Sequence, residues 1–136
     1  MARASATVSL AVEQCWTLVG SHRGRIWLCR RIRQTSGERA SVRFDGSWVL
    51  SREERRGDVV GFLHTHPDGP ASPSNRDLRT MRAWCSAFGK PLLCLISSPE
   101  GVQGFRFDDD ESDGTRLKIV EAFPRGVLIG VDAHGR

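Results

Sequence analysis

The stretch from Gly61 to Met81, GFLHTHPDGPASPSNRDLRTM, passes from an apolar run through a loop of proline, glycine and serine into a helical pattern. The apolar run ends in two histidines, His64 and His66, which are separated by one residue. Histidines at positions i and i+2 of a strand point to the same side, so their imidazoles can converge on one ion. The loop and the start of the helix can bring Asp77 there as an oxygen ligand. The stretch therefore predicts a metal site between a strand and a helix.

Two histidines and a carboxylate suit a catalytic zinc ion, which takes three protein ligands and leaves one position open. Zinc lowers the pKa of a bound water from about 15.7 to roughly 7. Hydrolysis also needs a donor for the oxyanion, and Ser74 lies one helical turn before Asp77. It needs a base as well, which we expect to be a carboxylate whose pKa is raised by apolar surroundings. Glu13, between LAV and QCWTLVG, meets that requirement.

Each of these residues also has a purely structural interpretation. Ser74 and Asp77 fit a helix-capping box, and capping is the commoner role for such a pair taken alone. A histidine at the end of a strand is more often a core or edge residue. The combination of the two histidines, the serine and aspartate spacing and the isolated glutamate favours the metal site over these interpretations.

The length and composition are those of an ordinary globular protein. The chain has 136 residues, which predicts one domain over residues 1–136. No apolar run approaches the length of a membrane span, and residues 1–10 lack a secretion signal, so we expect a cytoplasmic protein. The four cysteines form no CxxC pair and are expected to be buried thiols. The net charge of +4 is compatible with nucleic acid or with an acidic protein partner.

The pattern along the chain predicts an α/β fold, in which a mixed sheet carries packed helices. We expect strands at residues 7–12, 25–32, 40–44, 58–66, 91–97, 102–107, 119–123 and 127–131, with a hairpin turn at residues 20–24. Val60, Phe62, His64 and His66 should share one face of the fourth of these strands. His22 should be an exposed turn residue without a function, and His134 an uninvolved tail residue. We expect a short helix at residues 50–56 capped by Ser51, a longer helix from about Asn75 to Phe88, and a solvated acidic loop at residues 108–113.

The site residues match the signature of the JAMM (MPN-plus) metalloprotease family. That signature is an upstream glutamate, H-[ST]-H-P, a serine after seven further residues and an aspartate after two more. The segment from Glu13 to Gly20 resembles the family's glutamate segment, with Trp16 where a glycine is usual, and the resemblance extends from Val8 to about Phe107. It implies a cytidine-deaminase-like mixed β-sheet with packed helices in a single JAB/MPN domain. It also implies zinc held by His64, His66 and Asp77, Glu13 as acid/base and Ser74 as oxyanion stabiliser.

The family cleaves amide or isopeptide bonds, typically after the C-terminal glycine of ubiquitin or a ubiquitin-like protein. The resemblance thus implies a partner of this kind with a glycine-rich tail, in a bacterial conjugation or antiphage system or in sulfur-carrier processing. The HTHPDG segment also resembles the RadC-like branch of the same fold, which is associated with DNA repair and has no settled peptidase activity. Catalytically silent scaffolds of the family usually lack the metal ligands that this chain retains. We expect a peptidase with no membrane partner, favour a protein over nucleic acid as its partner, and leave its oligomeric state open.

Overall fold

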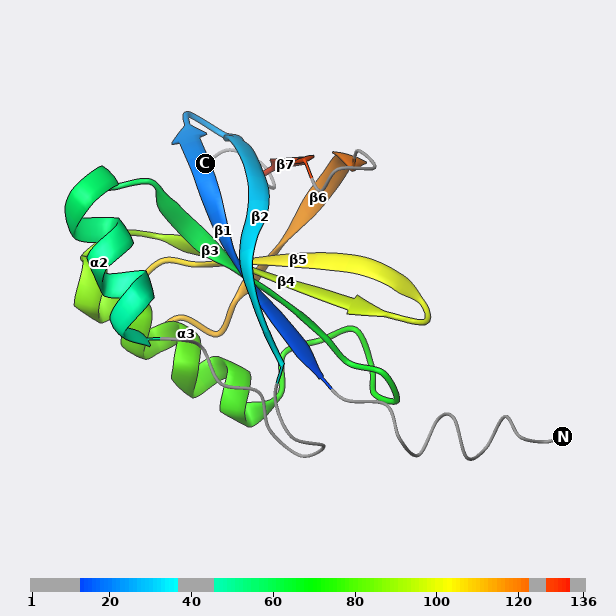
Figure 1. Cartoon of the computed structure of the whole chain (residues 1–136). Helices are drawn as coiled ribbons and strands as arrows, with labels where there is room; N and C mark the ends of the chain where they lie inside the picture. Colours follow the sequence, from blue (N-terminus) through cyan, green and yellow to red (C-terminus); the bar gives the residue numbers. More distant parts are fainter. Residues whose placement is uncertain (1–12, 37–45, 123–126, 133–136) are drawn as a thin grey trace, which may run out of the picture.

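The computed structural model describes residues 13–36, 46–122 and 127–132 (Figure 1). The strands expected at residues 7–12 and 40–44 and the residue His134 lie outside the described residues. The strands are β1 (Gln14–Arg23), β2 (Ile26–Ser36), β3 (Val59–Thr65), β4 (Leu92–Ser98), β5 (Gly101–Phe107), β6 (Thr115–Ala122) and β7 (Val127–Val131), and the helices are α2 (Gly46–Arg56) and α3 (Asn75–Phe88).

The strands form one closed barrel in the order β1-β2-β7-β6-β5-β4-β3. β3 and β4 are parallel, and every other neighbouring pair is antiparallel. A parallel pair needs a crossover connection, which here contains α3. The expected mixed sheet with packed helices is therefore confirmed. Its closure through pairing of β2 with β7 was not predicted, because the alternation of a strand does not reveal its partner.

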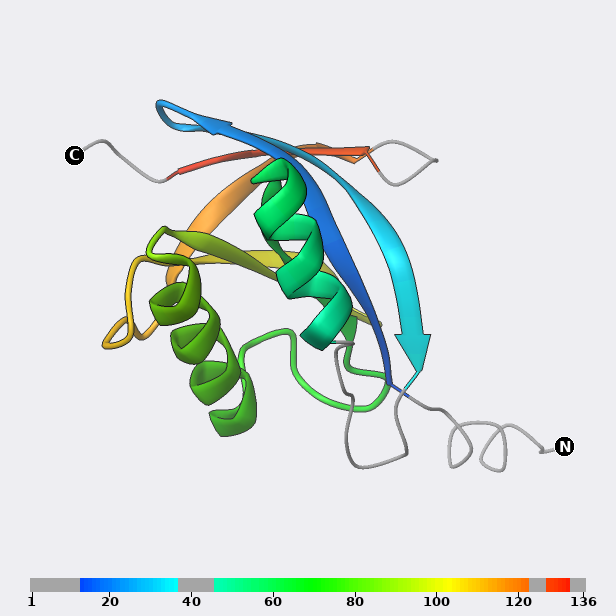
Figure 2. The ribbon, with the colours of Figure 1, turned by 60° about the vertical axis from the view of Figure 1, so that its left-hand side comes forward.

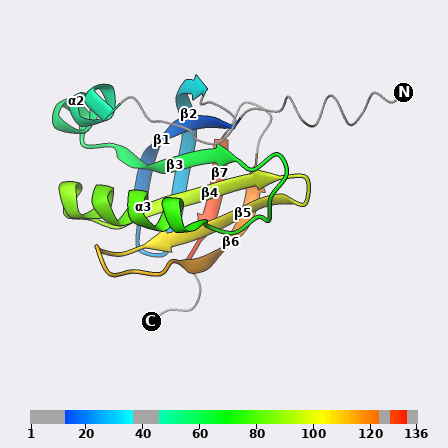
Figure 3. The same cartoon turned by 90° about the horizontal axis from the view of Figure 1, so that it is seen from below.

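The buried apolar residues among those described form two clusters. One lies between the sheet and the helices, which Figures 2 and 3 show packed outside the barrel; its buried members are Val49, Val59, Phe62, Met81, Cys85, Leu92, Cys94, Ile96, Phe105 and Phe107. The other comes from strands alone and fills the barrel; its buried members are Leu18, Trp27, Cys29, Val60, Leu63, Leu93, Leu95 and Leu117. All four cysteines of the chain are buried, and none forms a disulfide, as expected.

The predicted face of β3 is correct at its C-terminal end and wrong at Val60. Phe62 packs towards the helices, but Val60 belongs to the cluster inside the barrel. The reason is a register shift against β1 at this level, which breaks the two-residue alternation. Gly61 allows the close approach of β4 there, because a Cβ at Gly61 would lie 2.2 Å from the carbonyl oxygen of Leu93.

The predicted turn between β1 and β2 was placed too early. β1 continues through Arg23, and the turn lies at Gly24, which has a φ of 61°. Gly20 permits close strand contact instead, since a Cβ there would lie 2.0 Å from the carbonyl oxygen of Leu28. His22 is consequently a half-buried strand residue, stacked on Trp27 at 3.6 Å between ring centroids, and the expectation of an exposed turn histidine was wrong.

The helix α3 has the predicted bounds, and Gly89 ends it in the left-handed conformation. The helix α2 begins at Gly46, so Ser51 lies inside it and the predicted cap was wrong. The acidic residues 108–111 are exposed, as expected of a solvated loop. No helix among the described residues is long and apolar enough to cross a membrane.

Candidate metal centre

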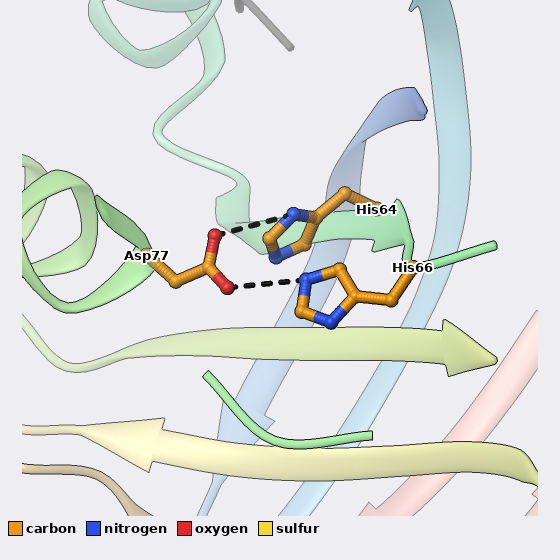
Figure 4. A group of neighbouring side chains, drawn as sticks. All are labelled: His64, His66 and Asp77. Carbon is orange, nitrogen blue, oxygen red and sulfur yellow. Dashed lines mark ion pairs between the residues drawn. The ribbon is translucent and has the colours of Figure 1, made fainter. Parts of the chain in front are cut away.

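The end of β3 and the first turn of α3 bring His64, His66 and Asp77 together (Figure 4). One ligand atom from each lies within 4.8 Å of those of the other two, and all three residues are buried. The Nδ1 atom of His64 is 3.4 Å from Oδ1 of Asp77, and Nε2 of His66 is 3.2 Å from Oδ2 of Asp77. The predicted cluster of two histidines and a carboxylate thus forms in the structure.

The orientation of His66 is determined by the loop that follows it. Its backbone N–H donates to the carbonyl oxygen of Ser97 at 2.8 Å, which ties the residue to the end of β4. Its ring atom Nδ1 is 2.8 Å from the carbonyl oxygen of Pro70. A carbonyl only accepts hydrogen bonds, so Nδ1 carries the proton and Nε2 faces Asp77.

Asp77 reaches the site because it is the third residue of α3. Its backbone N–H donates to Oγ of Ser74 at 3.1 Å, and its Oδ2 atom accepts from the backbone N–H of Ser74 at 2.8 Å. These two hydrogen bonds form a capping box at the helix start. The local rule that starts the helix therefore also sets the place of the carboxylate.

The protonation of the three residues suits cation binding. Burial lowers the pKa of His64, which favours the neutral imidazole. The hydrogen bond to Asp77 raises the pKa of His66 against the opposing effect of burial. Burial alone would raise the pKa of Asp77, but the hydrogen bond with His66 and the other contacts bring it below its usual value. The carboxylate is thus ionised, and a bound cation would replace the proton on His66.

The donor set matches a small divalent metal. Neutral imidazole nitrogens and a carboxylate oxygen are common zinc ligands, and three of them leave room for a water molecule or a substrate oxygen. The three residues are polar yet at most 8% exposed, although burying such groups is unfavourable without compensation. His64, His66 and Asp77 are therefore the described residues suited to hold a metal ion.

Glu13 lies beside this cluster, at the residue before β1. Together with His64, Asp77 and Met81 it lines a small cavity, and it also lines the wider cleft along residues 66–77. Burial raises its pKa, the positive charges of His66 and Arg76 oppose that shift, and the negative charge of Asp77 adds to it. The predicted base is thus close to the predicted ligands.

Trp16, which stands where the family usually has a glycine, is directed elsewhere. It pairs with Leu63 across β1 and β3, and it packs against the cluster inside the barrel. The guanidinium carbon of Arg31 lies 4.7 Å from its ring centroid. Trp16 lines neither the cavity nor the cleft, so its side chain leaves access to Glu13 open.

Ser74 is exposed and lines the cleft, as an oxyanion donor must. Its Oγ atom accepts the capping hydrogen bond, so the structural interpretation of this serine is observed. The hydroxyl hydrogen is not used by that bond, because the oxygen only accepts there. The geometry is compatible with both roles.

Two neighbours of the cluster were not predicted. Arg76, next to Asp77 in sequence, lines both the cavity and the cleft. Its position beside a predicted ligand could have identified it. The Sγ atom of Cys94 lies 3.5 Å from Nε2 of His64, and this contact joins residues 30 positions apart through the β3–β4 pair. No local sequence pattern predicts such a contact.

A family model described as prokaryotic homologs of the JAB domain matches residues 2–108. The chain belongs to this family. The predicted family resemblance is thereby confirmed. A protein of Pyrococcus furiosus named desampylase is 28% identical to this JAB-family chain over 116 residues, which cover 82% of this chain and 78% of that protein.

Proposed function

We propose that this JAB-family protein is a zinc-dependent peptidase or isopeptidase that cleaves after the C-terminal glycine of a ubiquitin-like protein. The observation that carries the proposal is the buried cluster of His64, His66 and Asp77, with Glu13 lining both the cavity at His64 and the cleft at His66. This combination provides metal ligands and a carboxylate base at one place. The similarity to a desampylase supports a ubiquitin-like substrate.

In the proposed mechanism, His64, His66 and Asp77 would hold the zinc ion, which would supply a Lewis acid for the scissile carbonyl and lower the pKa of a water molecule. The Glu13 carboxylate takes a proton from the attacking water and passes it to the nitrogen of the leaving amine. The Ser74 hydroxyl donates to the oxygen of the scissile carbonyl as negative charge develops on it.

The environment of Glu13 supports its assignment as the base. Burial raises the pKa of its carboxyl, and a base whose pKa lies nearer to neutrality is also a competent acid in the second step. The positive charges of His66 and Arg76 oppose the shift, which favours the ionised carboxylate that a base requires. One side chain can therefore accept the proton in the first step and donate it in the second.

The cleft supports an extended tail as the substrate segment. It has a volume of about 540 Å³ and is walled by the loop that contains Pro67, Gly69 and Pro70. A glycine-rich tail lacks side chains that would collide with such walls, and extended segments are commonly bound in grooves through their backbone. The charged residues that line the cleft are Glu13, Asp68, Arg76 and Asp77.

We further propose that residues 1–136 form a single cytidine-deaminase-like JAB/MPN domain. We place the protein in the cytoplasm of a bacterium, within a ubiquitin-like conjugation or antiphage system. Four buried thiols without a disulfide fit a reducing compartment.

The test combines metal content with cleavage, on wild type, Glu13→Gln and His66→Ala. The substrates are ubiquitin-like proteins that carry short C-terminal extensions after a terminal glycine pair. Wild type should hold about one zinc per chain and cleave; Glu13→Gln should keep zinc and lose cleavage, and His66→Ala should lose both. Zinc binding without cleavage of any substrate, combined with salt-sensitive DNA binding, would instead support the RadC-like alternative.

A further inference from the structure

Cys94 contacts the metal cluster from the side opposite Asp77. The Nδ1 atom of His64 faces Oδ1 of Asp77 at 3.4 Å, and its Nε2 atom faces Sγ of Cys94 at 3.5 Å. Cys94 has an exposed fraction of 0%, and His64 of 5%. The two ring nitrogens of His64 thus have different partners in a buried place.

The partner of the second nitrogen determines which tautomer a neutral histidine adopts. A histidine ligand binds a metal through the nitrogen without a proton, and the other N–H usually donates to a neighbouring group that orients the ring. For His66 this neighbouring group is the carbonyl oxygen of Pro70. For His64 the group in the equivalent position is the Cys94 sulfur, which is a weak but adequate acceptor.

We propose that Cys94 is a positioning residue of the metal centre, because its sulfur accepts a hydrogen bond from Nε2–H of His64 and holds Nδ1 towards Asp77. This inference rests on the proposed function only in taking His64 as a metal ligand. Cys94 reaches this position through its place on β4, where it pairs with Phe62, two residues before His64 on β3.

The alternative role of Cys94 is that of a small apolar residue in the core. Cys85 offers the matched comparison, because it is buried in the same cluster between sheet and helices. Its Sγ atom contacts the carbonyl oxygen of Phe107 at 3.4 Å and is not paired with a proposed ligand. Replacing either cysteine with valine removes a thiol from this core, but only Cys94→Val removes the partner of His64.

The experiment uses wild type, Cys94→Val, Cys94→Ser and Cys85→Val, each first shown to be folded by circular dichroism. The ring nitrogens of His64 are observed by NMR in the zinc-loaded proteins at mildly alkaline pH, because in the metal-free protein the ionised carboxylate of Asp77 itself favours a proton on Nδ1. Cobalt(II) affinity is measured by competition with a chelator, and the absorption spectrum of the cobalt form is recorded. Neither the NMR measurement nor the cobalt measurement requires peptidase activity.

In the zinc-loaded proteins we expect His64 to carry its proton on Nε2 in wild type, Cys94→Ser and Cys85→Val, and to lose that preference in Cys94→Val. Cobalt affinity should fall about 10-fold to 100-fold in Cys94→Val, as for other groups that orient histidine ligands, and should be retained in Cys85→Val. In Cys94→Ser the hydroxyl oxygen replaces the sulfur as acceptor, so most of the affinity should return.

Several results would overturn the inference. One is an Nδ1–H tautomer in wild type; another is an equal loss of affinity in Cys94→Val and Cys85→Val, which would leave a packing role alone. A near-ultraviolet charge-transfer band that disappears in Cys94→Ser would make Cys94 a ligand itself. The absence of any metal binding by wild type overturns this inference together with the proposed function. Cobalt binding without peptidase activity removes only the latter.

Discussion

The backbone N–H of Ser74 donates to Oδ2 of Asp77 at 2.8 Å, and Oγ of Ser74 accepts from the backbone N–H of Asp77 at 3.1 Å. Oδ2 of Asp77 is also the atom that lies 3.2 Å from Nε2 of His66. The capping box and the candidate metal cluster therefore share one carboxylate. Capping and ligation are not competing interpretations of these residues, since the cap places the ligand.

This shared geometry predicts that substitutions of Ser74 affect stability and activity to different extents. Replacing an N-cap serine with alanine costs about 0.5–2 kcal/mol of stability, whereas glycine costs only a few tenths. If the hydroxyl also stabilises the oxyanion, both variants should lose about 10²–10³-fold in kcat. Urea unfolding and initial rates on the same preparations measure the two effects. Full activity in Ser74→Gly would limit this serine to its capping role.

The charge of Arg76 predicts a change in the pH dependence of cleavage. Burial raises the pKa of Glu13, and the neighbouring Arg76 lowers it. The base must be ionised, so kcat/KM should fall as the pH drops through the pKa of Glu13. Arg76→Ala removes the lowering influence, so this acid limb should move to higher pH. A bound metal acts on both proteins alike and leaves the direction of the difference unchanged.

The matched control for this prediction is Arg79→Ala, because Arg79 is exposed on the same helix and lines neither the cavity nor the cleft. The measurement is kcat/KM against pH for all three proteins at constant ionic strength. An equal shift in both variants would assign the effect to net charge, and no shift in Arg76→Ala would remove Glu13 from the rate-limiting proton transfer.

The part of the site that the sequence predicted is the part made by local rules. The spacing from His64 to His66 exploits the two-residue period of a strand, and that from Ser74 to Asp77 exploits the first turn of a helix. The bounds of α3 could be predicted for the same reason, because apolar residues recur at helical spacing and Gly89 ends the helix.

What the sequence did not predict depends on contacts between distant segments. Gly20 and Gly24 look alike as turn residues in the sequence. Only Gly24 lies in the turn, while Gly20 leaves the space that the backbone of β2 occupies. The closure of β2 on β7 and the contact of Cys94 with His64 are of the same kind. Each requires knowledge of which strands are neighbours, and the alternation of one strand carries no such information.

The ion pair between Arg52 and Asp58 predicts a pH-dependent contribution to stability. The guanidinium group donates from Nε to Oδ1 at 2.9 Å and from Nη2 to Oδ2 at 2.7 Å. This hydrogen bonding holds the pKa of Asp58 below its usual value. A lowered folded-state pKa contributes stability above the unfolded-state pKa, about 3.9, and loses it as the pH falls through the folded-state value.

Asp58→Asn should therefore lower the free energy of unfolding by less than about 1 kcal/mol at neutral pH, because both partners are partly exposed. The difference from wild type should shrink below about pH 4 and vanish once the wild-type carboxyl is protonated. Urea unfolding across the pH range provides the measurement, with Asp110→Asn in the exposed acidic loop as the control. A cost that is independent of pH would contradict the electrostatic explanation.

The buried carboxylate of Asp132 predicts the largest loss of stability. Its Oδ1 atom accepts from Nε1 of the fully buried Trp27 at 2.7 Å, and its Oδ2 atom accepts from Arg106 at 2.5 Å and contacts Nε2 of His22 at 3.1 Å. These partners come from β2, β5 and β1, so one side chain at the end of β7 joins four strands of the closed barrel. Removing it leaves the buried indole N–H of Trp27 without its acceptor and takes one of two carboxylate partners from the half-buried Arg106.

Asp132→Ala should lower the free energy of unfolding by about 3 kcal/mol or more, since an arginine and an indole N–H lose a shared partner. Asp132→Asn should cost less, because its amide oxygen can still accept from Trp27. Urea unfolding of these variants is compared with that of Asp109→Ala in the exposed loop, and cobalt affinity is measured on the folded proteins.

Asp132 lies where β1 ends, while Glu13 and the paired residues Cys15 and His64 lie where β1 begins. If the Asp132 variants lose metal affinity as strongly as they lose stability, the two ends of the barrel are coupled. If they lose stability and keep metal affinity, Asp132 serves barrel closure alone.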